Sequence, residues 1–113
     1  VLFRSINKLL VQQNVSIVFH GHEHLYAKEE LDGVIYQEVP QPGHRSGNTR
    51  SAGSYGYDQR NVIGSSGHVR VAVTNSEVKV EYVKTRVGGT ELTASQRRYV
   101  ADSYSVKSLN IKP

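Results

Sequence analysis

The chain has 113 residues, with 14 lysine and arginine residues against 10 aspartate and glutamate residues, and a formal net charge of +4 at pH 7 with histidine neutral. This length fits at most one small domain. The absence of cysteine excludes a disulfide scaffold, a cysteine-ligated zinc site and a thiol nucleophile. No apolar run approaches the roughly 18 residues that a membrane-spanning helix needs. The charge is mild and mixed in sign, so it gives no argument for nucleic-acid binding. The 16 valines favour strands.

The first predicted element is a short amphipathic helix over residues 5–14. Ile6, Leu9 and Leu10 follow the helical spacing, and Ser5 can cap the start of the helix. Residues 1–5 resemble a translated sequencing-adapter tail, and the alternative is that they are native and simply begin the helix. Residues 15–19 form a compact apolar run, which predicts a buried strand. Helix and strand together indicate an α/β unit.

A hairpin is predicted next, over residues 25–39. Asp32-Gly33 separates two strand-like runs, and a type I′ turn needs a positive φ at both of its central positions. Pro40 and Pro42 end the second strand. Residues 41–60 are rich in glycine, serine, asparagine and arginine, which is typical of a long loop.

The rest of the chain predicts a second hairpin and a last strand. Gly67 opens the hairpin, and apolar and polar residues alternate with period two on both sides of Asn75-Ser76. A polar connection over residues 90–98 has room for one helical turn, and residues 100–106 predict a strand. We therefore expect mostly antiparallel β structure with one N-terminal helix.

The informative stretch of the sequence is a histidine cluster directly after the first predicted strand. Three of the five histidines, His20, His22 and His24, lie within five positions. Imidazole is a common metal ligand, and ligands often bind at the carboxyl end of strands in open α/β sheets. Gly21 is expected to let the backbone turn sharply, and Glu23 is expected to point away from its neighbours. The alternative is a weak, adventitious metal binder on a histidine-rich tract.

This cluster resembles a known motif. Residues 15–26 are similar to the last metal-binding motif of the calcineurin-like metallophosphoesterases, a superfamily that includes purple acid phosphatases and many secreted phosphatases and phosphodiesterases. That motif is Gly-His-x-His after a buried strand, and here it stands as Gly21-His22-Glu23-His24. Residues 32–36, 66–71 and 101–104 also resemble the C-terminal portion of bacterial members.

The resemblance implies a fold, a cofactor and a reaction. His22 would ligate one metal ion and His24 the other, in a four-layer α/β/β/α sandwich. Two ions (manganese, zinc or iron) would clamp a phosphomonoester or phosphodiester and activate a bridging water for in-line attack. The upstream motifs of the family, Asp-x-His, Gly-Asp and Gly-Asn-His, do not occur in this sequence. We therefore expect residues 6–113 to be the C-terminal portion of a single, larger metallophosphoesterase domain, inactive alone.

Four further residues are candidates for the site. His20 could act in catalysis by orienting a ligand or touching a phosphate oxygen, and the alternative is a histidine packed at the end of a strand. Tyr26 could contact substrate, and the alternative is a cross-strand aromatic pair. His44 and Arg45 could bind phosphate from the long loop, since an arginine fork suits phosphate oxygens, and the alternative is a solvated loop.

A second hypothesis belongs to a different functional class. The chain could be a complete, small, β-rich binding module without catalytic activity, with an incidental or structural histidine metal site. An apolar strand edge left exposed would favour the fragment, because the run at residues 16–19 is buried on both faces only beside further strands. Substrate identity, oligomeric state and localisation, including secretion or a bacterial periplasm, stay open at this level.

Overall fold

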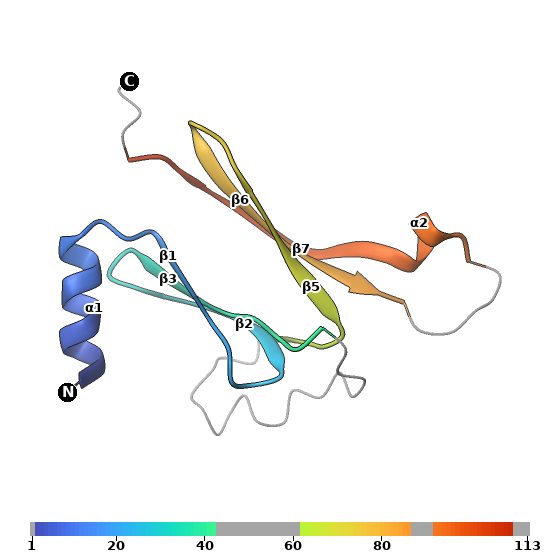
Figure 1. The fold of residues 1–113 in the computed structure, drawn as a ribbon, viewed down its shortest axis with the longest axis horizontal. Helices are drawn as coiled ribbons and strands as arrows, with labels where there is room; N and C mark the ends of the chain where they lie inside the picture. The colour runs from blue at the N-terminus through green and yellow to red at the C-terminus, as the bar shows by residue number, and fades with distance from the viewer. Residues whose placement is uncertain (1, 43–61, 87–91, 110–113) are drawn as a thin grey trace.

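The computed structural model describes residues 2–42, 62–86 and 92–109 and consists mainly of two β-sheets with a helix at the N-terminus (Figure 1). The first sheet has four strands in the order β1-β3-β2-β4, and the second has three in the order β5-β6-β7. This mixed, mostly antiparallel β architecture with an N-terminal helix is the one that the sequence predicted. In chain order the elements are α1 (Leu2–Gln12), β1 (Ile17–His20), β2 (Leu25–Leu31), β3 (Val34–Glu38), β4 (Val62–Gly64), β5 (Gly67–Val73), β6 (Glu77–Thr85), α2 (Ala94–Arg97) and β7 (Arg98–Lys107).

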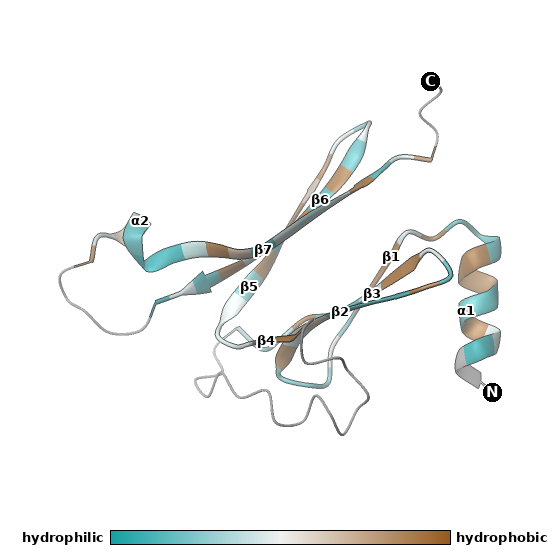
Figure 2. Ribbon diagram, turned by 180° about the vertical axis from the view of Figure 1, so that it is seen from behind, coloured by the Kyte–Doolittle hydropathy of each residue, from teal (hydrophilic) through white to brown (hydrophobic). Residues whose placement is uncertain are grey.

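Helix α1 is attached to the first sheet by a polar contact. The side chain of Asn7 is buried; its Nδ2 donates to Asp32 Oδ2 at 2.9 Å, and its Oδ1 accepts from the hydroxyl of Tyr36 at 2.5 Å. Ile6 and Leu9 are exposed among the described residues, and Figure 2 shows α1 next to the end of the sheet where the turn between β2 and β3 lies. The helix begins at Leu2, so the prediction that Ser5 caps its start is wrong.

Strand β1 lies at the edge of the first sheet. It pairs in parallel with β3 alone among the described strands, with Ile17 opposite Ile35 and His20 opposite Glu38. The prediction of a buried strand is wrong for these residues, because the side chains of β1 are only partly covered and Phe19 is 42 % exposed. The physical reason is that no described strand covers the outer edge of β1.

The predicted hairpin of β2 and β3 is confirmed. Asp32 and Gly33 both have positive φ, at 52° and 82°, as a type I′ turn requires. Leu31 lies opposite Val34 directly across this turn. Strand β4, which pairs with β2, is too short to show a period in the sequence and was not predicted.

The second sheet follows the predicted alternation. Val80 and Tyr82 of β6 are buried, whereas Lys79 before them is exposed and Glu81 between them is half-buried. A Cβ atom at Gly67 would lie 2.5 Å from the carbonyl oxygen of Val83, so glycine lets β5 close onto β6. The predicted helical turn is α2, whose start is closed by a capping box between Thr93 and Gln96.

The two sheets meet through tyrosines. The ring of Tyr26 on β2 stacks on Tyr82 of β6, with centroids 4.4 Å apart and planes 2° from parallel. The hydroxyl of Tyr26 donates to Asp102 of β7 at 2.6 Å, and the hydroxyl of Tyr104 donates to the side-chain oxygen of Gln37 on β3 at 2.9 Å. These contacts join β2 and β3 to β6 and β7, so the hairpin that follows the histidine cluster rests on the second sheet. Over the described part of the chain, no helix is long and apolar enough to cross a membrane.

A candidate metal-binding segment after strand β1

The histidine cluster forms the connection between β1 and β2. His20 is the last residue of β1, and Leu25 begins β2, so residues 21–24 span the gap between them. The backbone N–H of Val39 donates to the carbonyl of His20 at 2.8 Å, which extends the parallel pairing of β1 and β3 up to the start of this connection. This hydrogen bond therefore fixes the position of the backbone at His20, where the connection begins.

A buried carboxylate lies directly beside this segment. Glu38, the last residue of β3, is only 1 % exposed. Its Oε2 lies 2.5 Å from Nδ1 of His20, and its Oε1 accepts from the backbone N–H of Glu23 at 2.8 Å. Each oxygen thus holds a different part of the segment. Sequence reasoning missed Glu38, because only the parallel register of β1 and β3 brings it opposite His20.

His22 has an unusual backbone and an open side chain. Its φ is 122°, in a region that side-chain-bearing residues rarely adopt, and its side chain is 79 % exposed. The expectation that Gly21 supplies the sharp turn is therefore wrong: the positive φ falls on His22, and Gly21 has an ordinary φ. The expectation that Glu23 points away is also wrong, since Glu23 Oε1 lies 2.7 Å from Nδ1 of His22.

His24 is exposed at the end of the segment. Its carbonyl accepts from the hydroxyl of Ser65 at 2.7 Å, a bond that ties the segment to the chain just after β4. Hydrogen bonds thus anchor both ends of the connection: His20 is bonded to Val39, and His24 is bonded to Ser65. His22 stands between these anchors and, like His24, is exposed.

The segment offers two exposed imidazoles, His22 and His24, as its donor set. Nowhere in residues 2–42, 62–86 and 92–109 do three or more histidine, cysteine, aspartate or glutamate side chains gather as a metal-binding group. Two imidazoles close together in sequence suit manganese, zinc or iron when carboxylates complete the coordination. The residues fit a contribution of two ligands to a site that other residues close.

Comparison of the chain with protein-family models, with curated proteins and with solved structures finds no match in any of the three.

Tyr26 lies in the packing between the sheets. Its side chain is 1 % exposed, stacked on Tyr82 and bonded to Asp102. Burial, and then the hydrogen bond to Asp102, raise the pKa of Tyr26 above its ordinary range. The candidate role in substrate contact is thus corrected: this tyrosine is a neutral, buried donor that joins two strands from different sheets. His44 and Arg45 lie outside the described residues.

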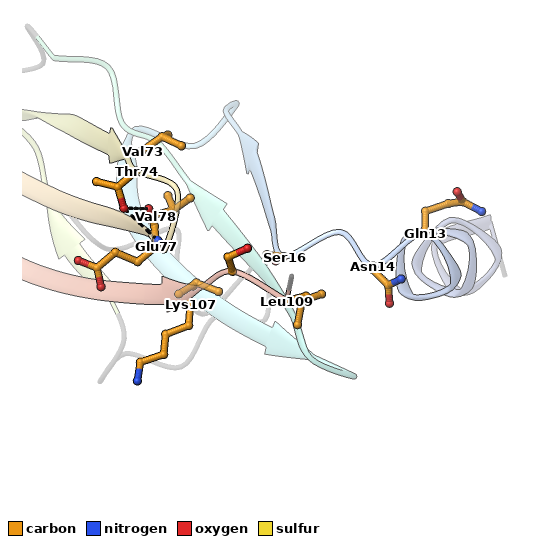
Figure 3. A pocket seen from close by; sticks show the side chains of 11 residues that line it. Gln13, Asn14, Ser16, Val73, Thr74, Glu77, Val78, Lys107 and Leu109 are labelled. Atoms are coloured by element: carbon orange, nitrogen blue, oxygen red, sulfur yellow. Dashed lines mark hydrogen bonds between the residues drawn. The ribbon is translucent and has the colours of Figure 1, made fainter. Parts of the chain in front are cut away.

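A pocket of about 670 Å³ lies at the opposite end of β1 from the histidines (Figure 3). Its walls come from the α1–β1 connection, from the β5–β6 turn and from the end of β7, with Ser16, Val73 and Leu109 among the lining residues. None of residues 20–24 lines it. The pocket therefore plays no part in the candidate site.

Proposed function

We propose that the segment 20–24 supplies two imidazole ligands, His22 and His24, to the dinuclear metal centre of a phosphoesterase that hydrolyses a phosphomonoester or phosphodiester. The observation that carries the proposal is the backbone of His22. A positive φ on a non-glycine residue costs of the order of 1–3 kcal/mol, and such residues gather at functional sites. Here the unfavourable conformation holds an exposed imidazole on a segment that is anchored at both ends.

The roles of the residues follow from their positions. His22 and His24 bind from one short connection, so the first sheet fixes the spacing between the two ligands. His20 stands beside them and holds or accepts a proton through its imidazole. When bound, the two ions would stabilise the negative charge of the phosphate and activate a water as the nucleophile.

The exposed edge of β1 supports a larger parent domain. Phe19 of β1 is 42 % exposed, and Ile6 and Leu9 of α1 are exposed among the described residues as well. Apolar side chains on an unpaired strand edge and on the adjoining helix are usually covered. A further strand beside β1 would cover them and would bring carboxylate ligands to the same end of the sheet, as in the four-layer α/β/β/α sandwich that we propose for the parent.

The test is made on the longest open reading frame that contains this chain. We expect His22→Ala and His24→Ala each to lower the bound manganese, zinc or iron and the hydrolysis of bis-p-nitrophenyl phosphate or p-nitrophenyl phosphate by about 100-fold or more. His68→Ala, an exposed histidine on β5, is the matched control and is expected to change neither. The 113-residue chain alone is expected to show no turnover with added manganese.

Two results would overturn the proposal. One is full metal content and unchanged hydrolysis in both variants of the longer protein. The other is a 113-residue chain that unfolds cooperatively as a monomer, with no longer reading frame around it, which would favour the non-catalytic binding module.

A further inference from the structure

We infer that Glu38 is the positioning residue of the histidine segment: it fixes the protonation pattern of the His20 ring and holds the backbone that follows His22. The link from this arrangement to metal binding rests on the proposed function. The arrangement itself concerns only groups of this chain and is testable without a metal.

The burial of Glu38 calls for a physical reason. Its side chain is 2 % exposed, and a carboxylate taken out of water is costly unless it is paired or hydrogen-bonded. Its neighbours on the first sheet, Val34 and Ile35, show that β3 accepts apolar side chains in buried positions. Contacts from the His20 ring and from the Glu23 backbone help to hold the carboxylate there.

The contact with the His20 ring selects one tautomer. A carboxylate oxygen 2.5 Å from Nδ1 requires a proton on that nitrogen. In the neutral ring the lone pair then lies on Nε2, which becomes the acceptor. The His20 side chain is 35 % exposed, so the ring is accessible from solvent although its Nδ1 is engaged by Glu38. Glu38 thereby makes His20 a proton acceptor at Nε2 for a group that approaches the segment.

The contact with the backbone restrains the strained residue. The N–H of Glu23 belongs to the peptide directly after His22, whose φ is 122°. A hydrogen bond from this peptide to a buried, ionised acceptor is of the stronger, charge-assisted kind. One carboxylate thus sets both the ring of the first histidine and the backbone of the second.

The test uses the 113-residue chain without metal. Long-range ¹H–¹⁵N spectra of histidine rings distinguish Nδ1–H, Nε2–H and doubly protonated imidazole, and are recorded in alkaline buffer, where imidazole is ordinarily neutral. The His20 signals are assigned by their loss in His20→Ala. We expect the wild-type ring to show the Nδ1–H pattern.

Glu38→Gln is the informative variant. Its amide oxygen can still accept from Glu23, whereas its NH₂ group can only donate to His20 Nδ1, so the ring is expected to switch to Nε2–H. Glu30→Gln, an exposed glutamate on β2, is the matched control and is expected to keep the wild-type pattern. In the longer protein we expect Glu38→Gln to weaken Mn²⁺ binding about 10- to 100-fold.

The outcomes separate the two proposals. A wild-type His20 ring with the Nε2–H or the doubly protonated pattern would overturn the positioning role, and this result does not depend on the folding of Glu38→Gln. A switch in Glu38→Gln together with unchanged metal binding in His22→Ala would support the positioning role and overturn the proposed function.

Discussion

At the scale of single residues, the end of β3 carries two buried polar side chains with different tasks. Gln37 and Glu38 are adjacent, and neighbouring residues of a strand point to opposite faces. Gln37 donates to the carbonyls of Ala27 and Glu38 and accepts from Tyr104 of the second sheet. Glu38 instead holds His20 and the backbone of Glu23. One strand end therefore connects the packing of the sheets with the histidine segment.

The backbone of His22 leads to a prediction about stability. We expect His22→Gly to raise the free energy of unfolding by about 1 kcal/mol, because glycine adopts a φ of 122° without the clash that any Cβ atom makes, although its own entropy cost offsets part of the gain. His22→Ala removes the imidazole but keeps a Cβ atom, and it is the control. Urea denaturation of both variants measures the difference.

The comparison of His22→Gly with His22→Ala shows whether the backbone of His22 is strained. If glycine and alanine at this position unfold at the same urea concentration, the backbone of His22 carries no strain. The support that strain gives to the proposed function would then be lost.

At the scale of elements, two glycines in the connections of the first sheet, Gly21 and Gly33, differ in what they contribute. Gly33 has a φ of 82° in the β2–β3 turn, whereas Gly21 has an ordinary φ, and a Cβ atom there would lie 3.9 Å from the carbonyl oxygen of Val39. We expect Gly33→Ala to destabilise the chain by about 1–2 kcal/mol, since the left-handed region is unfavourable for alanine. Gly21→Ala is expected to leave the free energy of unfolding within about 0.5 kcal/mol of the wild type.

Thermal or urea unfolding of the two alanine variants checks this prediction. Equal stability of both would contradict the turn geometry at Gly33. A large loss in Gly21→Ala would contradict the room that the structure gives at that position.

Local signals were enough to predict the hairpins. Asp32-Gly33 determines its turn through the φ values of two residues, and the alternation around Val80 follows from the period of a strand, so neither depends on distant parts of the chain. The alternation fails at β3, where Gln37 and Glu38 are both buried. They are buried because each finds a partner on another element, and that pairing cannot be derived from periodicity.

The candidate site was predictable only in part, for the same reason. The histidine cluster is visible as a run of residue types, and its place after β1 follows from the apolar run before it. The anchors Glu38 and Ser65 are 18 and 45 residues from His20 in the sequence, and only the sheet register and the return of the chain after β4 bring them to the segment. Exposure of β1 likewise depends on which strands lie beside it, which the period of a single strand does not specify.

At the scale of the whole molecule, the two sheets are joined by three tyrosines. Tyr26 and Tyr82 stack on each other, Tyr104 reaches Gln37, and Tyr82 donates to the carbonyl of Gly64 at 3.0 Å. Lys28 adds a contact over the ring of Tyr104, 4.2 Å from its centroid. The interface between the sheets thus depends on phenol groups that stay protonated.

This dependence predicts a loss of stability at alkaline pH. Burial raises the pKa of Tyr82 and of Tyr104 to about 12, and it raises that of Tyr26 further. In the unfolded chain tyrosine titrates near pH 10, so between about pH 10 and about pH 12 the unfolded state loses protons that the folded state keeps. The free energy of unfolding is therefore constant with respect to these groups below about pH 10, and it falls as the pH rises through this window.

Urea denaturation at a series of pH values across the window measures the slope. Lysines also titrate there, so the informative quantity is the difference between the wild type and Tyr104→Phe, which removes one of the phenols but keeps the ring. We expect the variant to be less stable at neutral pH, because Gln37 loses the hydroxyl that donates to it, and to lose stability less steeply above about pH 10. A wild-type slope in Tyr104→Phe would mean that its phenol is not held protonated by the interface, and the contact between Tyr104 and Gln37 would then not join the sheets in solution.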